Sequence, residues 1–263
     1  MDPKLSFDPP TYESGTFRNE GGRIITAIEV SSIQKLLRHQ RTGRILDVGT
    51  GTGRILRNLL DREVTFVGVD SDRKMLEHFA RKLRASSIEF AKIDLVVADA
   101  QSLPFKPNSF AAVTCIRVAR YFRQPARGVD ELCSVLEPNG RLVIEFANVL
   151  QPRAILQLIQ APFKGHVFPH LFTPSSMRRL ILARGILVDS VIGWHKFPPG
   201  ILVMVNRSQL VKFIANLETL LQRTTPVELL SRSIVISGLK RGESPEDTPS
   251  QNHSRKYYSS PRW

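Results

Sequence analysis

Short and nearly uninterrupted apolar runs recur between residues 44 and 146, and segments with helical spacing of their apolar positions separate them. The runs predict strands at 44–48, 65–69, 93–97, 111–116 and 141–146, and the intervening segments predict helices at 53–60, 73–84 and 126–136. Strands that are apolar on both faces are typical of a parallel sheet. Their alternation with helices indicates a doubly wound α/β fold with helices on both faces of the sheet.

The pattern changes on both sides of this region. Residues 1–20 contain three prolines and no periodicity, so we expect an irregular N-terminal arm over 1–22 and then a helix over 23–39. After residue 146, further helices are predicted at 153–159, 175–183 and 210–221, and strands at 186–194 and 233–239, which brings the mostly parallel sheet to seven strands. We therefore expect one domain over 23–240, with lid or insertion segments at about 150–183 and 197–226, and a disordered polar tail at 241–263.

Composition agrees with a globular protein of this kind. The chain has 263 residues, of which 42% are hydrophobic and 23% charged, and it lacks an apolar run of the roughly 20 residues that a membrane span needs. Its start has no apolar signal-peptide core. The two cysteines fall in a predicted strand and a predicted helix, which favours reduced core residues over a disulfide or a metal site. We expect a cytoplasmic protein without a metal.

The formal net charge of +13 is the unusual bulk feature. Residues 241–263 hold four Lys/Arg and three Asp/Glu, so the tail accounts for one unit and the remainder is basic in its own right. Such a surface attracts nucleic acid, an anionic membrane or acidic small molecules. Basicity without a partner stays equally open, because no dense Lys/Arg run interleaved with aromatic residues is present.

The stretch "ILDVGTGTGRIL" at 45–56 places three glycines at alternate positions directly after a predicted strand. A strand that leads through a glycine-rich turn presents backbone N–H groups to a ligand, and glycine allows close approach. A triphosphate loop needs Lys-Ser or Lys-Thr after its last glycine, and a dinucleotide turn needs its third glycine where Arg54 stands. Asp47, two residues before the first glycine, would repel a pyrophosphate and favour a cationic ligand.

Two further acids follow the next two predicted strands. Asp70 is placed to accept hydrogen bonds from both hydroxyls of a ribose, and Asp99 from an adenine amino group. Three acids at successive strand ends suit a cationic adenosine ligand that has no phosphates.

These stretches, together with "FVGVDSDRKMLEHFARKL", "VVADAQSLPFKPNSFAAVTC" and "ARGVDELCSVLEPNGRLVIEF", resemble the class I S-adenosylmethionine-dependent methyltransferases. The last two are similar to the methyltransferase type 11 branch that includes the ubiquinone and menaquinone biosynthesis enzymes. The resemblance extends over about 44–146 and implies a Rossmann-like methyltransferase fold that uses S-adenosyl-L-methionine. It also implies the cofactor-binding residues Asp47, Gly49, Gly51 and Gly53 for the methionine part, Asp70 for the ribose, Met75, Asp99 and Ala100 for the adenine, and Ile116 and Arg117 beside the acceptor.

The acceptor and any catalytic residue are less defined. Methyl transfer from a sulfonium depends on alignment and desolvation, and a general base is required only where the acceptor must lose a proton early. The chain lacks the [DN]-P-P-[YF] motif of amino-directed nucleic-acid methyltransferases, and it reads Arg-Val-Ala-Arg-Tyr at 117–121 where many relatives carry His-His or Asn-His. An acidic substrate group could meet Arg117 or Arg120. Weaker candidates for a catalytic role are His166, His170, His195 and Tyr12.

The predicted lid favours a small or lipophilic acceptor. Segments 161–172 and 197–221 are apolar and interrupted by prolines, so they could admit a quinone precursor or lipid and touch an anionic membrane, although packing of 210–221 on the core or on a second subunit is favoured. Methylation of RNA or protein stays open because of the charge, and so does a regulatory protein that binds the cofactor without turnover. A nicotinamide dehydrogenase is the least favoured, because Arg54 breaks its glycine spacing.

Overall fold

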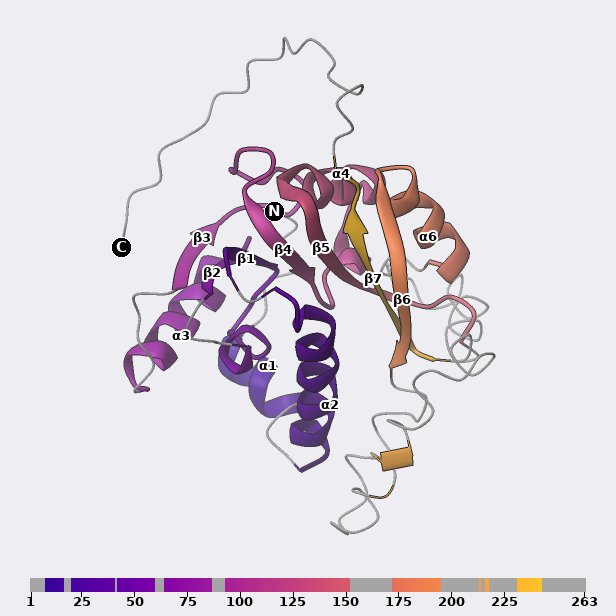
Figure 1. The fold of residues 1–263 in the computed structure, drawn as a ribbon. Coiled ribbons are helices and arrows are strands. Elements are labelled where there is room, and N and C mark those ends of the chain that lie inside the picture. The colour runs from indigo at the N-terminus through magenta and orange to yellow at the C-terminus, as the bar shows by residue number, and fades with distance from the viewer. Residues whose placement is uncertain are drawn as a thin grey trace.

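The computed structural model describes residues 8–16, 20–40, 42–59, 64–86, 93–151, 172–194 and 231–242, together with residues 213, 216 and 217. In this part of the chain a seven-stranded sheet has the order β3-β2-β1-β4-β5-β7-β6 (Figure 1). The first five strands are parallel, and β7 runs antiparallel between β5 and β6. The strands are β1 (Arg44–Val48), β2 (Thr65–Asp70), β3 (Ile93–Val97), β4 (Phe110–Cys115), β5 (Leu136–Ala147), β6 (Ile186–Trp194) and β7 (Ser233–Lys240).

Helices cover both faces of this sheet. The α-helices are α1 (Pro9–Thr16), α2 (Glu20–Leu37), α3 (Arg73–Arg84), α4 (Pro125–Val135) and α6 (Pro174–Leu182), and 3-10 turns lie at η2 (Leu56–Asn58) and η4 (Ala119–Tyr121). Figure 1 shows α1, α2 and α3 on one side of the sheet and α4 and α6 towards the other. The doubly wound α/β fold expected from the sequence is therefore confirmed.

Alternation along the strands divides the core into two layers. Ile45 of β1 packs with the buried residues of α2 and α3, such as Ile33 and Phe79. Leu46 and Val48 face the opposite way and pack with α4 and α6. Because successive side chains of a strand point to opposite faces, Asp47 lies on the α2–α3 face, one residue after Leu46. This places a buried acid on the same side of the sheet as the N-terminal helices.

Most predicted elements have the observed bounds or differ by one or two residues. The strands at 44–48, 93–97 and 186–194 and the helix at 73–84 coincide with β1, β3, β6 and α3. The helix expected at 23–39 begins earlier, at Glu20, and the strand expected at 141–146 begins five residues earlier, at Leu136. The predictions at 153–159 and 210–221, the lid segments at 152–171 and 197–226 apart from three residues, and the tail from 243 lie outside the described residues.

Two predictions are wrong. The described part of the segment 53–60, residues 53–59, forms turns and the short η2 and no α-helix, and Gly53 has a positive φ of 73°, which a right-handed helix does not include. The arm is not irregular throughout, since Pro9–Thr16 form α1. Asp8 accepts a hydrogen bond from the Thr11 backbone N–H at 3.1 Å, and proline is well tolerated in a first helical turn.

None of the described helices is both long and apolar enough to cross a membrane.

Candidate functional site

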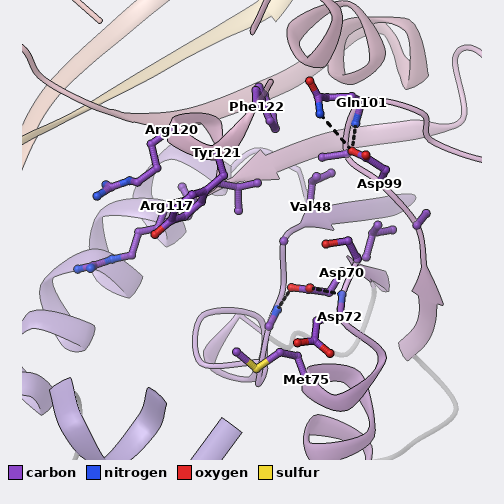
Figure 2. A pocket seen from close by; sticks show the side chains of 18 of the residues that line it. Val48, Asp70, Asp72, Met75, Asp99, Gln101, Arg117, Arg120, Tyr121 and Phe122 are labelled. Atoms are coloured by element: carbon purple, nitrogen blue, oxygen red, sulfur yellow. Dashed lines mark hydrogen bonds between the residues drawn. The ribbon is translucent and has the colours of Figure 1, made fainter. Parts of the chain in front are cut away.

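A cavity of about 480 Å³ opens at the carboxyl ends of β1, β2, β3 and β4. Figure 2 shows two groups of charged side chains around it. Asp70, Asp72 and Asp99 lie on one side and are called the acidic wall below. Arg117 and Arg120 lie on the other side, and together with Arg123, which also lines the cavity, they are called the arginine wall. Ligand sites in open α/β sheets form at this end of the strands.

The glycine turn forms the base of the cavity. The backbone N–H groups of Gly49 and Thr50 both donate to the carbonyl of Val69, at 2.7 and 2.9 Å, which fixes the turn to the end of β2. Gly49, with φ of 74°, meets the chain after β4, and a Cβ placed there would lie 2.0 Å from Val118 Cγ2. A Cβ on Gly51 would meet nothing closer than Asp70 Oδ2 at 3.9 Å. Gly49 is therefore required by packing and conformation, and Gly51 leaves open space at the cavity.

Asp70 is held in place by backbone donors. Its carboxylate accepts hydrogen bonds from Gly51 N–H and Asp72 N–H, each at 2.9 Å (Figure 2). Burial raises the pKa of Asp70, and these hydrogen bonds act in the opposite direction. Asp72 accepts from Lys74 N–H at 2.9 Å and caps α3, which carries the buried Met75 into the cavity lining.

Asp99 completes the acidic wall from the loop after β3. Its side chain is exposed, and Oδ1 accepts a hydrogen bond from Gln101 N–H at 2.9 Å. Ala100 lines the cavity beside it. The acidic wall therefore presents carboxylate oxygens at two depths, from Asp70 near the turn to Asp99 near solvent.

Asp47 lines a second cavity, of about 30 Å³, beside the glycine turn. The side chain is only 3% exposed, and its Oδ1 accepts a hydrogen bond from the Thr114 hydroxyl of β4 at 2.6 Å. Burial raises the pKa of Asp47 to about 6, and the hydrogen bond from Thr114 limits the rise. Tyr12, Gly49, Gly51, Ile116 and Arg117 line both cavities, so the two spaces adjoin.

The arginine wall is held by two fully buried glutamates. Glu29 of α2 and Glu145 of β5 are each 0% exposed. Glu29 Oε1 accepts from Arg117 Nη2 at 2.5 Å, and Glu145 Oε1 pairs with Arg120 Nη2 at 2.8 Å. Both guanidinium ends point away from the acidic wall in Figure 2. Burial opposes the charge on Arg117, but Glu29 and Glu145 together hold its pKa above the ordinary value.

The backbone of Arg117 is also constrained. Its φ is 65°, which is uncommon for a residue with a side chain, and its N–H donates to Glu145 Oε2 at 2.7 Å. Glu145 thus holds this turn by the backbone of one arginine and the side chain of another. Strain of this kind is typical of functional sites, where the surrounding structure enforces it.

The cavities bring most of the residues named from the sequence together. Gly49, Gly51, Asp70, Met75, Asp99, Ala100, Ile116 and Arg117 line the larger one, and Asp47 lines the smaller. Gly53 lines neither, and a Cβ there would lie 2.1 Å from Phe79 Cε2, so packing explains this glycine. Arg120 and Tyr12 line the larger cavity. His166, His170 and His195 lie outside the described residues. The binding roles of all these residues remain predictions.

Sequence reasoning missed Glu29, Glu145, Arg54 and Thr114. A signal existed for the two glutamates, because each interrupts an apolar pattern. Glu29 stands in the helical stripe between Ile25 and Ile33, and Glu145 stands in the run "LVIEF". A charged residue at such a position is seldom fully buried without a partner.

A comparison with known proteins finds similarity over the region that contains the glycine turn and the parallel strands. Residues 46–144 match a family model described as a methyltransferase domain. Over these residues, which include most of the parallel strands, the chain is similar to methyltransferase domains, in agreement with the resemblance.

Relatives of this segment are quinone-biosynthesis methyltransferases. A ubiquinone/menaquinone biosynthesis C-methyltransferase of Geotalea daltonii is 35% identical over 126 residues, which is 46% of this chain and 52% of that protein. A demethylmenaquinone methyltransferase of Thermus thermophilus is 36% identical over 49% of this chain and 57% of its own length. The chain thus spans about half the length of the curated relatives that it matches.

Solved structures extend the likeness to most of the fold. A Thermotoga maritima protein described as an S-adenosylmethionine-dependent methyltransferase matches 83% of this chain and 92% of its own, with a TM-score of 0.58 and 15% identity. A magnesium protoporphyrin IX methyltransferase from Synechocystis with bound S-adenosylhomocysteine matches 84% and 88%, with a TM-score of 0.59 and 15% identity. At this identity the likeness establishes the Rossmann-like methyltransferase fold.

Proposed function

We propose that the protein is an S-adenosylmethionine-dependent methyltransferase acting on a small, lipophilic acceptor. The observation that carries this proposal is the convergence of the glycine turn, Asp70 and Asp99 on one cavity, within a segment that matches a methyltransferase domain. The cavity suits the donor because its acids favour a cationic adenosine ligand, and because Gly51 leaves the turn open where a side chain would fill it.

In this proposal the acidic wall holds the adenosine half of the donor. Asp70 accepts hydrogen bonds from the ribose hydroxyls, Met75 packs on the adenine edge, and Asp99 with Ala100 recognises the adenine. The methionine half lies towards the glycine turn, with Asp47 near its amino group. Ile116 and Arg117 close over the donor where it meets the acceptor.

When bound, the donor supplies a methyl group on a sulfonium, and the C–S electron pair remains on sulfur after transfer. The residues of this chain contribute alignment and exclusion of water, which supply much of the rate of an in-line displacement. Tyr12, Tyr121 and Phe122 add aromatic side chains to the lining of the cavity, which suits a lipophilic acceptor. The curated relatives are named for ubiquinone and menaquinone biosynthesis, so a quinone-type ring is the first acceptor to test.

Binding is tested by calorimetry with S-adenosylhomocysteine and, separately, with NAD. We expect S-adenosylhomocysteine to bind and NAD not to bind. Asp99→Asn should weaken the binding of S-adenosylhomocysteine by about ten- to a hundredfold, because a hydrogen bond to a charged group contributes about 1.5–3 kcal/mol. Asp94→Asn is the matched control, since Asp94 is an exposed acid of β3 that does not line the cavity. Binding of NAD alone would overturn the proposal.

Turnover is tested with donor labelled in the methyl group. Reduced demethylmenaquinone analogues with short side chains, RNA, a protein extract and anionic vesicles carrying a lipid extract serve as acceptors. Label in the quinone supports the proposed acceptor, whereas label in RNA or protein supports the alternative suggested by the basic charge. Binding of the donor without label in any fraction indicates a regulatory protein. Location in the cytoplasm or at a membrane surface remains a prediction.

A further inference from the structure

Glu29 joins two arginines that come from different parts of the chain and line the smaller cavity. Its Oε2 pairs with Arg54 Nη2 at 2.7 Å, and its Oε1 accepts from Arg117 Nη2 at 2.5 Å and Nε at 3.2 Å. Arg54 follows the glycine turn, and Arg117 follows β4. Both arginines line the smaller cavity, and Arg117 lines the larger one as well. One buried carboxylate therefore faces two cations at the junction of the cavities.

The net charge of Glu29, Arg54 and Arg117 changes with the loss of any one of the three side chains. Glu29 with Arg54 and Arg117 carries a net charge of about +1 if all three are ionised. Loss of the carboxylate would leave two buried cations beside the glycine turn, and loss of one arginine would leave none in excess. Charges act strongly here because the low-dielectric interior screens them much less than water does.

This charge matters for a methyl donor because donor and product differ at one atom. The sulfur of S-adenosylmethionine is a cation, and the sulfur of S-adenosylhomocysteine is neutral, while the adenosine and amino-acid groups are the same. A change in local charge therefore alters the affinity for the donor more than the affinity for the product. A change that only loosens the site alters both affinities alike.

We propose that Glu29 sets the preference of this site for the donor over its demethylated product. It does so as a positioning residue, by offsetting one of the two positive charges of Arg54 and Arg117 and by holding both side chains, which weakens their repulsion of the sulfonium. The inference rests on the proposed function, because it requires that the cavity binds this donor.

Three variants and a control test the inference through the ratio of the two dissociation constants, measured by calorimetry. Glu29→Gln adds one net positive charge and should lower the preference for S-adenosylmethionine by at least about threefold. Arg117→Gln removes one and should shift the preference the other way. The double variant Glu29→Gln/Arg117→Gln restores the net charge and should return the ratio towards that of the wild type.

Glu131→Gln is the matched control. Glu131 is also buried, at 7% exposed, and accepts a hydrogen bond from Leu103 N–H at 3.0 Å on the α4 side of the sheet. The substitution should either leave the binding of both ligands unchanged or weaken both by the same factor. The ratio of the two dissociation constants should therefore stay at the wild-type value.

The outcomes separate the two proposals. If the wild type binds neither ligand, the proposed function is overturned. If the wild type binds both and Glu29→Gln weakens both equally, Glu29 is only a structural tie between α2 and the segment after β4, and the inference is wrong. If Glu29→Gln does not fold, as judged by circular dichroism and thermal melting, the test rests on Arg117→Gln. In that case the inference is wrong if the ratio of the two dissociation constants stays at the wild-type value or moves against S-adenosylmethionine.

Discussion

The acidic wall and the arginine wall face each other across one cavity, but the chain builds them by different means (Figure 2). Asp70, Asp72 and Asp99 are fixed mainly by backbone N–H donors, several of them two residues away in the sequence. The arginine wall is fixed by side-chain pairs that reach 25 to 88 residues along the chain, from Arg120 to Glu145 and from Arg117 to Glu29. One wall is therefore a product of strand ends and turns, and the other is a product of tertiary packing.

This difference indicates which wall tolerates amino-acid substitutions. A wall held by backbone donors keeps its shape as long as the sheet forms, because those donors do not depend on side-chain identity. A wall held by buried ion pairs is sensitive to single substitutions, because removing one partner leaves an uncompensated buried charge. Single substitutions should therefore disturb the arginine wall more than the acidic wall.

The contact between the glycine turn and the segment after β4, which carries the arginine wall, gives the largest expected effect. In Gly49→Ala, the new Cβ would lie 2.0 Å from Val118 Cγ2, at a φ of 74°. The left-handed backbone costs about 1–2 kcal/mol and the overpacking about 1–3 kcal/mol more, so we expect a free energy of unfolding lower by about 2–5 kcal/mol. Urea denaturation measures the loss, and calorimetry should show donor binding abolished.

The matched control for this variant is Gly185→Ala. Gly185 has a similar φ of 75°, and a Cβ there would meet no atom within 4 Å. It should therefore show the backbone cost alone, about 1–2 kcal/mol, with donor binding retained. Equal losses in the two variants would mean that the close contact of Gly49 with Val118 contributes nothing to the loss of stability.

The same difference explains what the sequence could predict. The strands, the glycine turn and the acids at the strand ends were predictable because apolar runs and turn residues are local signals. The pairing of Arg117 with Glu29 was not, since no local pattern tells which buried acid meets which arginine. The helix expected at 53–60 was wrong at its start because Gly53 has a positive φ of 73°, and the sequence does not tell which glycines of the turn adopt this conformation. Asp8 before Pro9 was a cap signal that the lack of periodicity obscured.

The second-largest expected effect is a pH dependence of the free energy of unfolding that arises from Asp47, which is buried on the α2–α3 face of the sheet. Burial raises the pKa of Asp47 from about 3.8 to about 6, so the folded chain holds this proton more tightly than the unfolded chain. The resulting stability is fully present below about pH 3.8 and is lost as the pH rises through 6, with a total of about 3 kcal/mol. Asp47→Asn cannot ionise, and its side-chain oxygen can still accept from Thr114.

The stability of Asp47→Asn relative to the wild type should therefore increase by about 1–2 kcal/mol between pH 5 and pH 7.5. Urea denaturation of both proteins across this range measures the change. Asp94→Asn, which removes an exposed carboxylate of β3, is the comparison for general charge effects. If the stability of Asp47→Asn relative to the wild type does not vary with pH, the pKa of Asp47 is not raised in the folded chain, and this prediction is wrong.

The smallest expected effect concerns α1, which reaches both cavities through Tyr12. Glu13 of α1 pairs with Lys82 of α3, whose Nζ also donates to the Thr52 carbonyl of the glycine turn at 3.0 Å. Glu13→Gln should lower the free energy of unfolding by only about 0.5–1 kcal/mol, because this ion pair is partly solvated. Since Tyr12 of α1 lines both cavities, a loosened α1 should let S-adenosylhomocysteine dissociate about two- to fivefold faster, as measured by stopped-flow fluorescence. Glu77→Gln, on the exposed side of α3, should leave the rate unchanged, and equal rates in all three proteins would mean that α1 does not retain the ligand.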